Sequence, residues 1–315
     1  MNHRNLLASV ATAVIVALAC PAFAQDIAFR SDQSYPESFT YSAKQDVFLV
    51  GSVTRGLVAK VDKAGAYTPF IADDRLVSTV GLLVDDARNT LWVTNSDPGA
   101  GDRTAAASQG TLAAIATYDA TTGKSKAYYD LGSLREGSHF ANDIALDADG
   151  NAYITDSFAP LIYKIDTKGK ASIFAQSPLF LTSQGFNLNG IAWHRDGYLL
   201  VGKYNSGELF RISTTDPTDI KPVRLPEALV GADGIHLIDA EHLLVVQNLG
   251  ADRTVELTST DGWRSATILR EKNSALSMPT AATTAGDAIY VLNARLDTLF
   301  DPKAVKVGDY LLQEF

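Results

Sequence analysis

NDIALDADGNAYITDS, residues 142–157, is the stretch that decides the fold. It consists of two short, apolar-rich runs separated by an Asp- and Gly-rich turn, which is typical of a β-hairpin. The pattern recurs five more times, as ESFTYSAKQDVFLVGS from Glu37, GLLVDDARNTLWVTNS from Gly81, NGIAWHRDGYLLVGKY from Asn189, DGIHLIDAEHLLVVQN from Asp233 and PTAATTAGDAIYVLNA from Pro279. The six copies start 44, 61, 47, 44 and 46 residues apart, so the chain is a repeat protein with one outlier spacing.

Each hairpin is followed by further strand-like runs. In the clearest copy the four predicted strands are residues 143–147, 151–156, 161–166 and 171–176. Six such units predict an all-β fold, a six-bladed β-propeller with four-stranded antiparallel blades, in which each blade buries its sheet faces against its neighbours. A sandwich would not repeat its sequence at this interval, and a β-helix repeats at a far shorter one. The propeller is therefore the preferred interpretation.

The start of the chain has the features of a secretory leader. A short basic start precedes an apolar run over residues 6–19, and the small residues Ala22 and Ala24 offer a cleavage site. We expect residues 1–24 to be removed as a signal peptide and residues 25–315 to form a single propeller domain, exported to the periplasm or secreted. The alternative is a lipoprotein that keeps Cys20 as its first residue, but the preceding residues match a lipidation motif poorly.

Composition and missing motifs argue against several functions. The formal net charge of −9 disfavours nucleic acid and anionic membrane as partners. Cys20 is the only cysteine, so the processed chain would have no thiol nucleophile. The sequence also lacks a Gly-x-Ser-x-Gly elbow, a His-Glu-x-x-His motif and a phosphate-binding Gly-rich loop. We expect a monomer whose partner is a small molecule.

Four oxygen-bearing side chains open the repeat at one phase: Glu37, Asn142, Asn189 and Asp233. In a propeller the first strand of each blade lines the central channel. The residue that precedes it therefore lies at one end of the channel, which we call the mouth. Four oxygen ligands with a summed charge of −2 favour one hard divalent cation, with Ca²⁺ the first choice. The alternative is that Asn and Asp before Gly only form turns with left-handed backbone.

Other side chains are also expected near the mouth. Second strands return to it, and polar residues stand near their ends: Asn95, Asp156, Lys203, Gln247 and Asn293. Of these, Asn95 is predicted to contact substrate. His139 precedes Asn142 by three residues and should overhang the mouth. The outlier spacing comes mostly from a Gly/Ala/Ser-rich insertion, residues 97–110, whose position makes it a candidate lid.

At these positions the chain resembles the gluconolactonase and senescence-marker-protein (regucalcin) family of six-bladed propellers, and more distantly paraoxonases and strictosidine-synthase-like proteins. The resemblance spans residues 26–315 and depends on the four motifs together. It implies that a divalent metal is held by Glu37, Asn189 and Asp233. It also implies that the Asn142-Asp143 pair binds the metal or contacts substrate. Ser38-Phe39-Thr40 replaces the usual Gly-Pro and nearby Trp of that family, which affects the expected substrate more than the metal.

Members of that family commonly hydrolyse lactones, which implies an exported, metal-dependent hydrolase of lactones or related esters. The metal would polarise the carbonyl, and a protein base would still be needed, since calcium acidifies water less than zinc does. Asp233 and His139 are the candidates for that base. Two alternatives stay open: a ligand- or protein-binding propeller with a structural calcium ion, and a lyase or condensing enzyme on the same scaffold.

Overall fold

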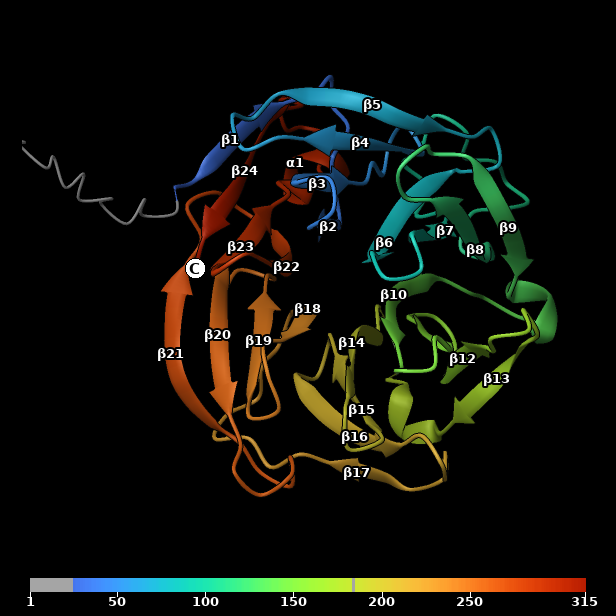
Figure 1. Cartoon of the computed structure of the whole chain (residues 1–315), viewed down its shortest axis with the longest axis vertical. Helices are drawn as coiled ribbons and strands as arrows, with labels where there is room; N and C mark the ends of the chain where they lie inside the picture. Colours follow the sequence, from blue (N-terminus) through green and yellow to red (C-terminus); the bar gives the residue numbers. More distant parts are fainter. Residues whose placement is uncertain (1–24, 183–184) are drawn as a thin grey trace, which may run out of the picture.

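Six four-stranded antiparallel sheets surround a common centre in the computed structural model, which describes residues 25–182 and 185–315 (Figure 1). The predicted all-β, six-bladed propeller with four-stranded antiparallel blades is confirmed. The predicted leader and Cys20 lie outside the described residues. The only α-helix in the described ranges is α1 (Leu296–Phe300), and no described helix has the length and apolarity needed to cross a membrane.

The first three blades follow one another along the chain. Blade 1 contains β2 (Phe39–Ser42), β3 (Val47–Val50), β4 (Leu57–Val61) and β5 (Tyr67–Ala72). Blade 2 contains β6 (Ser78–Asp85), β7 (Thr90–Ser96), β8 (Ala113–Asp119) and β9 (Ser125–Asp130). Blade 3 contains β10 (Ala141–Leu146), β11 (Ala152–Asp156), β12 (Leu161–Ile165) and β13 (Ala171–Gln176), and its strands lie within two residues of their predicted limits.

The last three blades complete the ring. Blade 4 contains β14 (Leu188–His194), β15 (Tyr198–Lys203), β16 (Glu208–Ser213) and β17 (Ile220–Pro222). Blade 5 contains β18 (Ala232–Leu237), β19 (His242–Gln247), β20 (Arg253–Thr258) and β21 (Thr267–Asn273). Blade 6 contains β22 (Pro279–Ala285), β23 (Ala288–Asn293), β24 (Asp309–Glu314) and, as its outer strand, β1 (Ile27–Arg30). Short 3₁₀ turns at Gly132–Leu134 and Pro178–Phe180 precede blades 3 and 4.

The hydrophobic core is divided among the interfaces between blades. Leu49 and Val58 of blade 1, for example, pack in one buried cluster with Leu82 and Leu91 of blade 2. Similar clusters join blades 2 and 3, blades 3 and 4, blades 4 and 5, and blades 6 and 1. Alternation along each strand lets both sheet faces contribute apolar side chains, so the ring holds its inner strands rigidly around the channel.

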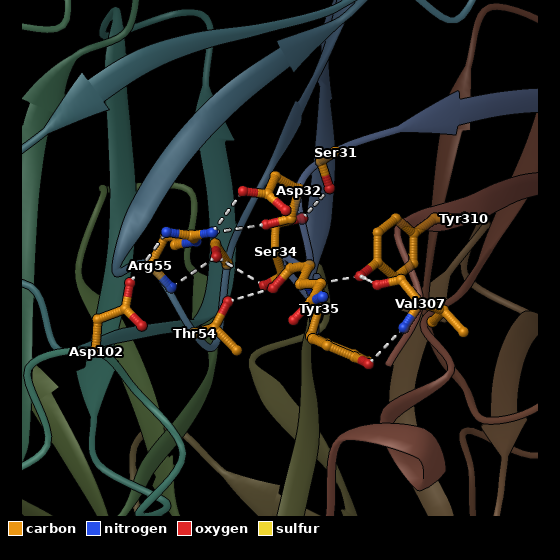
Figure 2. Close-up of polar contacts among 11 residues, drawn as sticks. Ser31, Asp32, Ser34, Tyr35, Thr54, Arg55, Asp102, Val307 and Tyr310 are labelled. Atoms are coloured by element: carbon orange, nitrogen blue, oxygen red, sulfur yellow. Dashed lines mark hydrogen bonds and ion pairs between the residues drawn. The ribbon is translucent and has the colours of Figure 1, made fainter. Parts of the chain in front are cut away.

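Strand β1 closes the ring by pairing antiparallel with β24 from the opposite end of the chain. Figure 2 shows the segment that leads from this closure into blade 1. The backbone N–H of Tyr35 donates to the Tyr310 hydroxyl (3.0 Å), and the Val307 N–H donates to the Tyr35 hydroxyl (2.9 Å). Nearby, Arg55 forms an ion pair with Asp32 (2.8 Å). This segment ends two residues before Glu37, so the closure also positions that carboxylate.

The innermost strands carry a repeated irregularity. In blades 2 to 5 the register between the first and second strands shifts by one residue near the start of the first strand, as at Ala141↔Asp156 followed by Ile144↔Ile154. A shorter form of the shift occurs in blade 6, whereas the register of blade 1 is regular. Each shift is a β-bulge, which inserts an extra residue and redirects side chains.

Candidate functional site

The bulges carry the predicted ligands. Asn142, Asn189 and Asp233 each follow the first paired residue of an inner strand, at Ala141, Leu188 and Ala232. All three side chains are buried. Glu37 lies two residues before β2, in the one blade whose first and second strands pair in a regular register. The inner ends of blades 1, 3, 4 and 5 therefore present these four residues around one end of the channel.

The Gly residues that follow two of these ligands are not turn formers. Gly190 and Gly234 do not adopt positive φ angles. A Cβ atom on Gly190 would lie 2.6 Å from the carbonyl oxygen of Asp233, and one on Gly234 would lie 2.5 Å from that of Thr280. Glycine is needed because neighbouring inner strands approach closely here, so the turn interpretation of these Asn-Gly and Asp-Gly pairs does not hold.

Asp233 is the centre of a hydrogen-bonded chain that links blades 4 and 5. Its Oδ1 accepts from the Asn189 side-chain amide (2.6 Å) and its Oδ2 from the Asn248 amide (2.5 Å). The oxygen of Asn248 accepts from the Tyr204 hydroxyl (2.6 Å). The amide of Asn142 donates to the Ser157 hydroxyl instead (2.9 Å). These contacts leave the amide oxygens of Asn142 and Asn189 as the ends that could reach a cation.

Three carboxyl groups share this part of the channel, and all three have raised pKa values. Burial raises the pKa of Glu37 well above its ordinary value, and the charges of Asp233 and Asp143 raise it further. Burial also raises the pKa of Asp233 to about 7 and that of Asp143 to about 7, although hydrogen bonds oppose both shifts. No described Lys, Arg or His forms an ion pair with these groups. The negative charge is therefore uncompensated within the described chain.

Asp143 extends the cluster into the channel. Its Oδ1 accepts from the Ile144 N–H (2.8 Å) and its Oδ2 from the Ile191 N–H at a longer 3.4 Å. The carboxyl group also lines a cavity of about 420 Å³ that the inner strands of the blades surround. His236, which lines the same cavity, bonds to Thr284 (2.7 Å), and burial lowers its pKa to about 4. Of the three acids, only Asp143 lines this space.

His139 has a different environment from the one expected of a catalytic base. Its Nδ1 lies 2.7 Å from an Asp156 carboxylate oxygen, and its Nε2 lies 2.6 Å from the carbonyl oxygen of Arg135. The Tyr163 hydroxyl also lies 3.0 Å from Nδ1, and the Asp156 contact raises the His139 pKa. Both ring nitrogens are thus engaged within blade 3, and the role of His139 as a base stays a prediction that these contacts do not favour.

Asp156 explains why His139 is held there. The Oδ1 atom of Asp156 accepts hydrogen bonds from three backbone N–H groups, those of Phe140, Phe158 and Ala159, each at 2.9 Å. Its Oδ2 atom, which contacts His139, also accepts from the Tyr163 hydroxyl (2.8 Å). We call His139, Asp156 and Tyr163 the blade 3 anchor, because together they fix the segment that enters β10.

Asn95 fixes the segment that enters blade 2, as the blade 3 anchor fixes the segment that enters β10. Its Oδ1 accepts from the Val77 N–H (2.7 Å), and its amide donates to the Arg75 carbonyl (2.8 Å) and the Tyr128 hydroxyl (3.1 Å). The equivalent residues Lys203, Gln247 and Asn293 likewise bind the backbone that leads into their blades. The side-chain oxygen and amide of Asn95 are thus engaged within blade 2, and its contact with substrate stays a prediction that these bonds do not favour.

Sequence reasoning missed the residues one position further along. Ser157, Tyr204 and Asn248 follow Asp156, Lys203 and Gln247, and they reach the site ligands or one another. Successive side chains along a strand point to opposite faces, so a shift of one residue changes the group from a loop anchor to a channel-facing one. Their signal was present as the last residue of each repeat copy.

Hydrogen bonds connect the insertion at residues 97–110 to the backbone of blade 1. Asp97 accepts hydrogen bonds from the Thr104 and Ser108 hydroxyls (2.7 and 2.6 Å). Arg103 donates to the carbonyl oxygen of Arg55 (2.7 Å), and the Asp102 N–H donates to that of Thr54 (2.7 Å). These bonds join blade 2 to blade 1, and they favour a fixed bridge over a freely moving lid.

The donor set fits a hard divalent cation. Every candidate ligand offers oxygen, and the buried acids have no cationic partner among the described residues. Within the described residues, no group of three or more His, Cys, Asp or Glu side chains could hold a metal ion. A cation at this place would therefore depend on the amide oxygens of Asn142 and Asn189 as well as on acids.

Comparison with known proteins supports the fold. No family model matches the chain, and no curated protein does. Among solved structures, the Malassezia sympodialis allergen Mala s 1 is 18% identical with a TM-score of 0.73, over 93% of this chain and 96% of that one. A gluconolactonase from Xanthomonas campestris is 14% identical with a TM-score of 0.62, over 93% and 91%. Virginiamycin B lyase from Staphylococcus aureus is 14% identical with a TM-score of 0.61, over 92% and 98%.

These similarities define the class of architecture. The structural neighbours include gluconolactonase-like propellers, and they also include an allergen and a lyase. At such identities the shared feature is the fold, and propellers support many activities. The function must therefore be argued from the residues in the channel.

Proposed function

We propose that the protein is an exported, divalent-metal-dependent hydrolase of lactones or related esters that acts in the propeller channel. The observation that carries this proposal is the cluster of Glu37, Asp143 and Asp233, one buried and two partly buried acids without a cationic partner among the described residues. Burying uncompensated carboxylates is unfavourable unless a ligand or proton compensates them. Perturbed acids in a channel are also a common mark of a functional site.

The residues that would hold the metal are Glu37, Asn142, Asn189 and Asp233. Their oxygen-only donor set favours Ca²⁺ over a nitrogen- or sulfur-seeking ion. When bound, such an ion supplies Lewis-acid polarisation of a carbonyl and stabilisation of the resulting oxyanion. The amides of Asn189 and Asn248 fix the orientation of the Asp233 carboxylate through their hydrogen bonds. Asp233 is therefore proposed as a ligand in preference to a base.

Asp143 is proposed as the base. It lines the cavity, and its carboxylate accepts only backbone N–H groups, one of them at 3.4 Å. Its pKa of about 7 suits proton transfer near neutral pH. Asp143 would take a proton from the attacking water, and Asn142 beside it would orient the substrate or complete the metal shell. This assignment replaces the expected role of His139.

The direct test is metal analysis of the purified protein, followed by a panel of lactones and aryl esters with and without a chelator. We expect bound divalent metal, turnover of at least one lactone, loss of turnover on chelation and recovery with calcium. Asp233→Asn should lose metal affinity and turnover together. Calcium binding without turnover of any lactone or ester would contradict the hydrolase proposal. Unfolding on chelation, again without turnover, would support a binding propeller with a structural ion.

A further inference from the structure

Thr280 occupies the site position of blade 6. It follows Pro279, which pairs with Asn293, just as Asp233 follows Ala232, which pairs with Gln247. The register shift in blade 6 falls at Thr280. The sequence of this copy gives no carboxylate or amide here, so the repeat alone marks blade 6 as lacking a ligand.

The hydroxyl of Thr280 is buried without a partner. The residue is 1% exposed, and its Oγ1 has no hydrogen-bond partner among the described residues. An unmade hydrogen bond of a buried hydroxyl is unfavourable by about 1–3 kcal/mol. Other hydroxyls on the inner strands are satisfied: Thr79 donates to the carbonyl oxygen of Leu57 (2.9 Å), and Thr40 accepts from the Val84 N–H (3.3 Å). The Thr280 hydroxyl is therefore an exception that calls for a ligand.

Thr280 also adjoins the acids of the site. A Cβ atom on Gly234 would lie 2.5 Å from the Thr280 carbonyl oxygen, so the two inner strands touch at this level. The amide of Asn248 contacts both the Asp233 carboxylate (2.5 Å) and the carbonyl oxygen of Pro279 (3.3 Å). On the other side, β22 lies against β2, the strand that follows Glu37. Blade 6 thus stands between the blades that supply Asp233 and Glu37.

We propose that the Thr280 hydroxyl oxygen is a further donor to the cation held in the channel. With it, the oxygen donors form an unbroken arc over blades 3, 4, 5, 6 and 1. Blade 2 closes the ring with buried, apolar Val80 at the equivalent position. The inference rests on the proposed cation site. It adds a neutral ligand from blade 6, between Asp233 of blade 5 and Glu37 of blade 1.

The test compares calcium affinity with stability in calcium-free buffer. Thr280→Val keeps the shape and removes the hydroxyl, so we expect calcium affinity, measured by isothermal titration calorimetry, to fall about tenfold. The melting temperature without calcium should stay the same or rise, because the variant removes a buried hydroxyl that has no partner. Thr283→Val, on the same strand and also buried, is the matched control and should leave calcium affinity unchanged.

A second pair of variants isolates the hydroxyl if valine disturbs folding. Thr280→Ser and Thr280→Ala both lose the methyl group and differ only in the hydroxyl. Serine should bind calcium nearly as tightly as the wild type, and alanine about tenfold more weakly. Equal affinity of these two variants, with calcium binding intact in the wild type, would overturn the role of Thr280 alone. No calcium binding by the wild type would overturn the cation site and the role of Thr280 with it.

Discussion

The blade 3 anchor and the channel site each contain a buried carboxylate, but only the blade 3 anchor surrounds it with groups that compensate its charge. Asp156 is matched by the His139 ring, whose pKa this contact raises, by a tyrosine hydroxyl and by three backbone N–H groups. Asp233 has only two side-chain amides, and its pKa is raised to about 7. A buried acid that the protein compensates itself is structural. One that it leaves uncompensated is available to a ligand.

The largest expected effect comes from the same substitution in both regions. Asp156→Asn removes the buried carboxylate that His139, the Tyr163 hydroxyl and three backbone N–H groups contact, so the free energy of unfolding should fall by about 3–5 kcal/mol. Asp233→Asn in calcium-free buffer removes an uncompensated charge, so stability should stay the same or rise. Urea denaturation of both variants measures the difference. Equal losses of stability would remove the distinction between the two regions.

Next in size is the effect on catalysis of removing the proposed base. Asp143→Asn should lower turnover of a lactone by about 100-fold or more, because general base catalysis supplies roughly that factor. Calcium affinity should change far less than in Asp233→Asn. Tyr163→Phe is the control, since it alters the blade 3 anchor and contacts no channel acid. Turnover that survives in Asp143→Asn would assign the base elsewhere.

The pH dependence of stability should separate the regions by a smaller amount. The folded-state pKa values of Asp143 and Asp233 are raised to about 7, so their stabilising contribution is complete below about pH 4 and is lost as pH rises through about 7. The pKa of Glu37 is raised as well, so its contribution is lost in the same direction. Without calcium, stability should therefore fall by roughly 2–3 kcal/mol for each of Asp143 and Asp233 between pH 5 and pH 8.

Calcium distinguishes the two sources of this loss. The His139 pKa is also raised, so its contribution is likewise complete below about pH 6.5 and is lost at higher pH. Saturating calcium should abolish the channel part and leave the His139 part. Thermal melts at both pH values, with and without calcium, provide the measurement. A loss of equal size under both conditions would mean that the channel acids do not bind the ion.

The smallest expected effect concerns the insertion. Arg103→Ala removes two hydrogen bonds to the backbone, at Arg55 and Leu76, and should lower stability by about 1 kcal/mol. If the insertion is a fixed bridge, kcat for a lactone should remain unchanged, and stopped-flow kinetics should show no new slow step. A change in kcat without a change in stability would support a moving lid.

The sequence predicts the fold well because the information is periodic. Hairpins at near-constant spacing, with an inner strand that begins at Asn142, Asn189 or Asp233, are sufficient to infer the blades, the channel and the side chains at its end. The first copy begins at Glu37, so nothing in the repeat indicates that β1 returns to complete blade 6. That pairing joins Ile27 to Leu312 across almost the whole chain.

The sequence predicts the candidate site less well than the fold, because the function of each site residue depends on contacts with residues that are distant in the chain. His139 has the position of a mouth residue, but Asp156 and Tyr163 engage its ring from later strands. Asn95 and Asn248 occupy adjacent positions of the repeat, and their side chains have different partners. The bulges that orient the ligands can be detected in the sequence only by the glycines at 190 and 234. Thr280 is inconspicuous until its register and its unmatched hydroxyl are known.

The central claim is that the channel acids form a cation site that protons occupy in its absence. The most direct measurement is a calcium titration by isothermal calorimetry in buffers of different ionisation enthalpy, at pH 6.5 and pH 8.5. We predict one ion per chain, with protons released on binding at pH 6.5 and far fewer at pH 8.5. No binding, or binding without proton release that persists in Asp233→Asn, would contradict the claim.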